Sequence, residues 1–135
     1  MKCKHFRIEE LVSPNVFKRF GQNAWCFFDP RFLSVSDRLR IKFGPMTINN
    51  WLWGGSFLHR GLRTPLDPLA PKGDFSTHRF GMGGDADFRF ATVQEVRAYI
   101  IAHPADFPEI KGLELDVSWL HYDVRNAEHL VLFKA

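Results

Sequence analysis

The 135-residue sequence predicts a single α+β domain with a mostly antiparallel sheet and flanking helices. Helical patterns come first along the chain, and strand-like segments then surround one further helix, which is the order typical of this class. The length fits one domain that can bury a core without disulfide bonds. Hydrophobic residues make up 45% and charged residues 24% of the chain, as in an ordinary globular domain.

The first half of the chain is expected to contain more helix than strand. In order, the expected elements are a weak helix over 6–20 interrupted at Pro14, a helix from a cap at Ser34 or Ser36 through Ile41, and a strand over 46–48. Gly44 and Pro45 end the second helix, because both residue types stop helices. Residues 49–72 are then irregular and rich in Trp, Gly and Pro, and a loop of this length in a small domain is usually functional.

The second half of the chain is expected to supply most of the sheet. In order, we expect a strand over 88–90, a helix that begins at Thr92, and strands over 113–117, 119–124 and 130–133. Thr92 and Glu95 have the spacing of a capping box, in which each side chain satisfies a free amide at the helix start. Residues 113–117 alternate between apolar and acidic, as in a half-exposed strand.

Charge and hydropathy exclude several classes of partner. The net charge of +3 comes from scattered Lys and Arg residues without a basic run, so no nucleic-acid partner is predicted. No stretch is apolar for long enough to span a membrane. The N-terminal stretch lacks the apolar segment of a signal peptide, so we expect cytoplasmic synthesis. The expected state is a monomer.

One short stretch, residues 76–88 with the sequence STHRFGMGGDADF, carries chemistry beyond what a turn needs. Zinc favours imidazole nitrogen and carboxylate oxygen, and catalytic zinc sites use three protein ligands with a fourth position left open. His78 and Asp85 can supply two ligands if the glycines between them fold the backbone back through positive φ angles. The third ligand should come from another strand, and His121 is the candidate because Trp119 and Tyr122 flank it.

These residues resemble a known family. The pattern Ser76-x-His78-x-x-Gly81-x-Gly83-x-Asp85, followed by Trp119-x-His121, resembles the signature of the zinc D-alanyl-D-alanine carboxypeptidase family. That family includes phage endolysin peptidases and shares its fold with the Hedgehog signalling domain. The resemblance extends over residues 39–40, 44–48 and 60–63, and covers roughly residues 33–126.

The resemblance implies roles for individual residues. It makes His78, Asp85 and His121 the zinc ligands, and it makes Ser76 a hydroxyl that contacts the substrate or supports a ligand. Arg63 stands where the family carries an arginine that binds substrate and stabilises the carbonyl oxygen under attack, and Arg60 is a rival for this role. A guanidinium near the metal would offset the charge that develops on that oxygen. Trp51, Trp53 and Trp119 are expected to wall the cleft.

The general base is the point at which this sequence departs from many relatives. They place an acidic residue three positions before the last histidine, where this chain has Ser118. Glu114 and Asp116 are the remaining candidates, and a strand period of two puts both on one face. Relatives with a Trp-x-His-x-Asp-x-Arg ending often carry an earlier glutamate, which favours Glu114. Asp123 is expected on the same face as His121, where it would orient that ring.

The resulting expectation is a Zn²⁺-dependent peptidase that hydrolyses amide bonds in peptidoglycan stem peptides, as a D-Ala-D-Ala carboxypeptidase or an endolysin-type endopeptidase. Synthesis without a signal peptide fits a phage or prophage lysin that is released to the cell wall by another protein. The alternative is a catalytically inactive Hedgehog-like zinc-binding or phage structural module. The presence of a general base separates the two, since a structural zinc site needs none.

Overall fold

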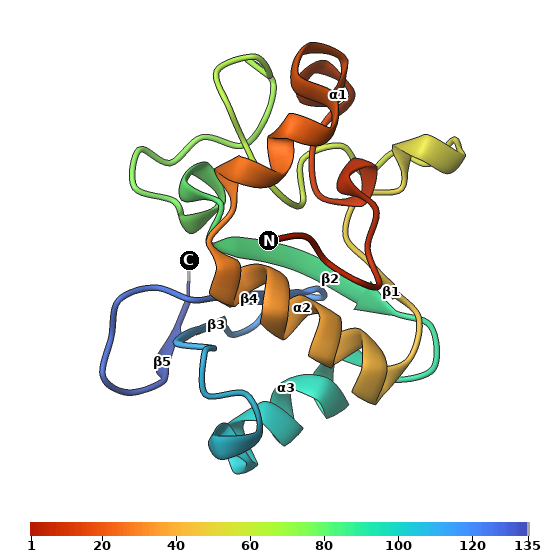
Figure 1. Ribbon diagram of the computed structural model, residues 1–135. Helices are drawn as coiled ribbons and strands as arrows, with labels where there is room; N and C mark the ends of the chain where they lie inside the picture. Colours follow the sequence, from red (N-terminus) through yellow and green to blue (C-terminus); the bar gives the residue numbers. More distant parts are fainter. Residues whose placement is uncertain (135) are drawn as a thin grey trace.

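A computed structural model describes residues 1–134 and shows a single α+β domain with three α-helices and five strands (Figure 1). The helices are α1 (Pro14–Phe20), α2 (Pro30–Phe43) and α3 (Val93–Ala102). The strands are β1 (Met46–Thr47), β2 (Gly83–Phe88), β3 (Gly112–Glu114), β4 (Leu120–Asp123) and β5 (Val131–Phe133). Short 3-10 helices cover Ile8–Glu10, Gly21–Phe27, Trp51–Trp53, Thr77–Phe80 and Pro104–Asp106. Among residues 1–134, no helix is long and apolar enough to cross a membrane.

The five strands form one mixed sheet in the order β1-β2-β4-β3-β5. The pairs β1–β2, β2–β4 and β3–β4 are antiparallel, as the sequence predicts, whereas β5 runs parallel to β3. In the central pair Asp85 lies opposite His121, and in the next pair Gly112 lies opposite Asp123. The registers of these central strands therefore bring acidic and histidine side chains from distant parts of the chain together.

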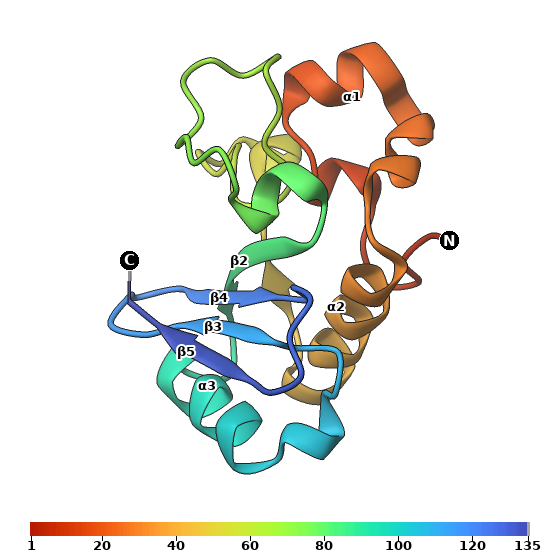
Figure 2. The same ribbon diagram turned by 90° about the vertical axis from the view of Figure 1, so that its left-hand side faces the viewer.

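The two faces of the sheet differ in what they pack against. Helix α2 lies across one face, and α3 runs beside it (Figures 1 and 2). On that face the buried Tyr122 stacks on Phe32 of α2, with ring centroids 5.4 Å apart, and its hydroxyl lies 2.6 Å from Ser36 Oγ. Side chains alternate along a strand, so His121 and Asp123 point to the opposite face.

Two helices begin at different residues from those predicted. Helix α2 starts at Pro30, because the Asp29 side chain accepts a hydrogen bond from the Arg31 amide and acts as the cap. Ser36, predicted as a possible cap, is instead buried within the helix. Pro14 begins α1 rather than interrupting it, since proline is well tolerated in the first helical turn. Thr92 starts α3 through the predicted capping box.

The predicted strands also shift. The strand expected over 88–90 is β2, which ends at Phe88 and begins early enough to contain Asp85. Strand β3 ends at Glu114 rather than continuing to 117, and Asp116 adopts a left-handed φ of 61°. The segment between β1 and β2 contains no strand, and in both views it lies above the sheet together with α1 (Figures 1 and 2).

Candidate metal centre

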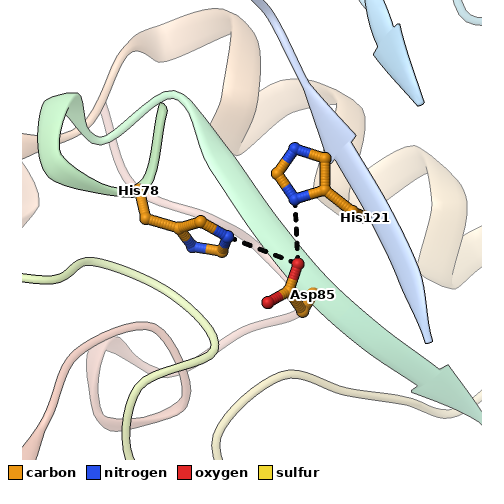
Figure 3. Close-up of side chains that lie close together, drawn as sticks. All are labelled: His78, Asp85 and His121. Carbon is orange, nitrogen blue, oxygen red and sulfur yellow. Dashed lines mark hydrogen bonds and ion pairs between the residues drawn. The ribbon is translucent and has the colours of Figure 1, made fainter. Parts of the chain in front are cut away.

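His78, Asp85 and His121 form a buried cluster on the face of the sheet opposite α2. Oδ1 of Asp85 lies 2.9 Å from Nδ1 of His121 and 3.3 Å from Nε2 of His78. Figure 3 shows the two rings pointing at this one carboxylate oxygen from different elements. One possible ligand atom from each residue lies within 4.8 Å of the other two.

A tight turn connects the first two members of this cluster. His78 lies in the 3-10 helix Thr77–Phe80, whose N-terminus is capped by the side chain of Ser76. Gly81 ends that helix with φ of 66°, and a Cβ atom there would collide with the carbonyl oxygen of Phe27. Only Gly81 has the positive φ that the sequence suggested for three glycines. Gly83 and Gly84 are extended within β2.

In each histidine, the ring nitrogen that faces away from Asp85 makes a hydrogen bond that fixes the ring's orientation. Nδ1 of His78 lies 2.8 Å from the carbonyl oxygen of Gly61, which can only accept, so Nδ1 carries the proton and Nε2 faces Asp85. Nε2 of His121 lies 2.9 Å from Oδ2 of Asp123, which leaves Nδ1 facing Asp85. The expected role of Asp123 as an orienting partner therefore matches its position. Such outer partners are typical of metal-binding histidines.

The charges in the cluster are strongly coupled. Burial alone would raise the pKa of Asp85, but its close contacts with His121 and His78 outweigh that effect and hold the pKa well below its usual range. Burial alone would lower the pKa of His121, yet its bonds to Asp123 and Asp85 raise it to about 9. In the absence of metal, a proton on His121 thus supplies the positive charge between the two carboxylates.

The donor set and its spacing can hold a metal ion. Zinc bonds to nitrogen and oxygen are about 2 Å long, so the ligand atoms of a tetrahedral site lie about 3.3 Å apart. The 2.9 Å and 3.3 Å separations around Asp85 are close to this value. A metal ion would take the place of the His121 proton, with both outer hydrogen bonds kept.

The cluster lies at a cavity of about 610 Å³. The cavity is lined by Arg63, Pro71, Phe75, Ser76, Thr77, His78, Asp85, Glu114, Trp119, His121, Arg125 and Phe133. It therefore brings together the three expected metal ligands, two of the candidate catalytic residues, Arg63 and Glu114, and the expected substrate contacts Ser76 and Trp119.

The structure separates the two candidates for the general base. The β3–β4 register pairs Leu113 with Tyr122. Continued by one residue, this register places Glu114 opposite His121. Glu114 is only 9% exposed and lines the cavity. Asp116 lies beyond the end of β3, is 69% exposed and forms a surface ion pair with Lys134 at 2.8 Å. Its predicted place on the same face as Glu114 is wrong, because the strand ends before it.

The two arginines are also placed differently. Arg63 lines the cavity, and its Nη2 donates to Oδ2 of Asp85 at 3.1 Å while Nε donates to the His59 carbonyl. Burial lowers the pKa of Arg63, and the charges of Asp85 and Glu114 act against that shift. The guanidinium of Arg60 instead pairs with Asp87 at 2.7 Å, and neither residue lines the cavity. Of the two arginines, Arg63 is therefore the one that lines this cavity.

The aromatic walls differ from the predicted ones. Trp119 lines the cavity, but Trp51 donates its indole N–H to the Val12 carbonyl and Trp53 is 63% exposed, and neither belongs to the cavity lining. Phe75 and Phe133 take their place. The position of Phe75 directly before Ser76 was a local signal. Phe133 reaches the cavity only through the parallel β3–β5 pairing, which has no local signature.

Comparison with protein-family models, with curated proteins and with solved structures finds no match to this chain.

Proposed function

We propose that this domain is a zinc-dependent peptidase that hydrolyses an amide bond in peptidoglycan stem peptides, and that its fold is of the Hedgehog/DD-peptidase type. One observation carries the proposal. A buried His-Asp-His donor set lies in a cavity that also contains a carboxylate and a guanidinium, those of Glu114 and Arg63.

The open cavity favours a catalytic site over a structural one. A structural zinc ion is normally enclosed by four protein ligands, whereas a catalytic site keeps one position for water or substrate. Here the possible metal-binding group has three members, His78, Asp85 and His121, and a cavity of about 610 Å³ adjoins them. Glu114 has no ion-pair partner among the described residues 1–134, and a carboxylate so placed is suited to accept a proton.

The side chains around the cluster have distinct parts in the proposed reaction. A zinc ion, when bound, supplies Lewis-acid chemistry, because it acidifies water and polarises a carbonyl group. Glu114 accepts the proton of the attacking water and delivers it to the amine that leaves. Arg63 donates to the carbonyl oxygen as negative charge develops there. Phe75, Trp119 and Phe133 line the cavity and would contact the apolar parts of the substrate.

The choice of substrate rests on the resemblance of two ligand motifs to the zinc D-alanyl-D-alanine carboxypeptidase family. Ser76, His78, Gly81 and Asp85 match the first motif, and Trp119 and His121 match the second. The antiparallel pairing of Asp85 with His121 supports the view that the motifs act together. A phage or prophage lysin that reaches the wall by another protein's action is the biological setting we propose.

Purified peptidoglycan tests the proposal directly. The protein is assayed against walls of several stem-peptide types after chelation, and again after zinc is restored. Release of free amino groups should require zinc and should stop when it is removed. A zinc-loaded protein that releases none from any wall type would favour the Hedgehog-like binding module instead.

A further inference from the structure

Arg125, which the proposed reaction does not use, makes a two-pronged ion pair with Asp123 directly behind His121. Its Nε donates to Oδ1 of Asp123 at 2.8 Å, and its Nη2 donates to Oδ2 at 2.6 Å. The Arg125 backbone amide also donates to Oδ1, at 3.2 Å. Asp123 is fully buried, and its Oδ2 accepts in addition from Nε2 of His121. Arg125 therefore fixes both oxygens of the carboxylate that holds the ring.

The neighbouring strands are shaped around this ion pair. Gly112 lies opposite Asp123 in the β3–β4 ladder, and a Cβ atom there would collide with both Asp123 oxygens and with Nε of Arg125. On the other side, Phe133 of β5 has its ring 4.6 Å from the Arg125 guanidinium and edge-on to His121. The Arg125–Asp123 ion pair is therefore confined between the backbone of Gly112 and the ring of Phe133.

This arrangement determines which nitrogen of His121 can bind a metal. An ionised carboxylate only accepts hydrogen bonds, so Oδ2 of Asp123 requires a proton on Nε2. In the neutral ring Nδ1 then carries the lone pair, and Nδ1 is the atom that faces Asp85 and His78. A planar guanidinium that binds both oxygens holds the carboxylate more firmly than a single point charge does.

We propose that Arg125 is a positioning residue that, through Asp123, locks His121 in the tautomer whose Nδ1 faces the metal centre. The inference rests on the metal centre of the proposed function, but it does not depend on which bond is cleaved. It assigns a role to Gly112 as well, because only glycine leaves room for the pair.

Zinc affinity and the tautomer of His121 test this without any substrate. Affinity is measured by competition with a chromophoric chelator, and the tautomer by long-range ¹H–¹⁵N spectra of the metal-free protein labelled at histidine, at a pH at which the ring is neutral, because a bound metal would itself fix the proton on Nε2. Replacing partners behind a ligand typically weakens metal binding by about 10–100-fold, and we expect Arg125→Met to lose zinc affinity within that range. In the metal-free variant the neutral His121 ring should no longer show the single Nε2–H form.

Two further variants make the test specific. Arg125→Lys keeps the positive charge but cannot bind both carboxylate oxygens with two N–H groups, so its zinc affinity and tautomer should resemble those of Arg125→Met. This variant remains informative if the methionine variant does not fold. Arg31→Met is the matched control, because Arg31 makes the same two-pronged contact with Asp29 and lines a surface cavity with Arg125. It should keep wild-type affinity and tautomer.

The outcomes separate this inference from the proposed function. Unchanged affinity in both Arg125 variants would overturn it, as would weaker binding with the Nε2–H form intact. Wild-type zinc affinity in Arg125→Lys alone would also contradict the inference, because a positive charge without the two-pronged contact would then be sufficient to hold Asp123. A wild type that binds no zinc would overturn the metal centre itself, whereas a zinc-binding protein that cuts no peptide would count only against the peptidase.

Discussion

Asp85 and His121 lie directly opposite each other in the antiparallel β2–β4 pair, with Oδ1 and Nδ1 2.9 Å apart. Their separation is set by the register of two central strands rather than by a loop. A register slip of one residue would turn either side chain to the α2 face, so the sheet fixes the pair firmly. His78 alone of the cluster depends on a turn, the one that Gly81 allows.

Metal content should depend on all three members of the cluster. We expect about one zinc ion per chain in the wild type, since three protein ligands form one catalytic-type site. His78→Ala removes a ligand and should purify with little zinc, as measured by elemental analysis. His129→Ala, at an exposed histidine, is the control and should keep its zinc. Equal occupancy in wild type and His78→Ala would remove His78 from the site.

The metal-free protein should lose stability as the pH rises from about 6.5 to about 9. The pKa of His121 is raised from its ordinary value of 6.5 to about 9 in the fold, so the protonated ring stabilises the folded state. This contribution to stability is complete below pH 6.5 and disappears as the pH rises through the pKa of His121 in the folded state. Each pKa unit corresponds to about 1.4 kcal/mol, so the loss should be on the order of 3 kcal/mol.

Urea unfolding in the presence of a chelator, repeated across this pH range, measures the effect. His121→Gln lacks the titrating group, so its unfolding free energy should change much less over the same interval. A wild type whose stability stays flat from pH 6.5 to 9 would show that the two carboxylates do not hold this proton. Zinc affinity should rise over the same interval, because the ion binds the deprotonated ring.

Arg63 and Arg60 form a natural pair for testing the oxyanion contact. Loss of one such donor typically lowers turnover by about 100-fold or more, and we expect that effect for Arg63→Ala with zinc still bound. Arg60→Ala should have a far smaller effect on turnover, since its guanidinium pairs with Asp87 outside the cavity lining. Steady-state kinetics and zinc analysis of both variants decide the assignment. The reverse order of effects would transfer the role to Arg60.

The sequence was most informative where the chemistry is local. His78 and Asp85 lie seven positions apart around glycines, and this short motif was enough to select them. The aromatic residues that flank His121 indicate it as the third ligand, and the structure brings it to the other two. The helix cap at Thr92 is likewise a local pattern, which the structure confirms.

Features that depend on strand ends and on non-local pairing were not predictable in the same way. Alternation put Glu114 and Asp116 on one face, but β3 ends between them and Asp116 turns to a positive φ. Phe133 enters the cavity because β5 pairs with β3 in parallel, although the two strands lie far apart in the sequence. Trp51 was expected in the cleft by residue type alone, yet its indole bonds to the N-terminal segment at Val12.

Replacing Glu114 by Gln tests the central claim, that the cavity is a peptidase active site, most directly. Gln keeps the shape of the side chain but cannot accept a proton at neutral pH, and general-base catalysis contributes about 10²–10⁴-fold in rate. Glu114→Gln should therefore lower the rate of amino-group release from peptidoglycan by that factor, while zinc content and melting temperature stay near wild type. Asp116→Asn, at the exposed ion pair with Lys134, is the matched control and should retain wild-type activity. Full activity in Glu114→Gln would contradict the account.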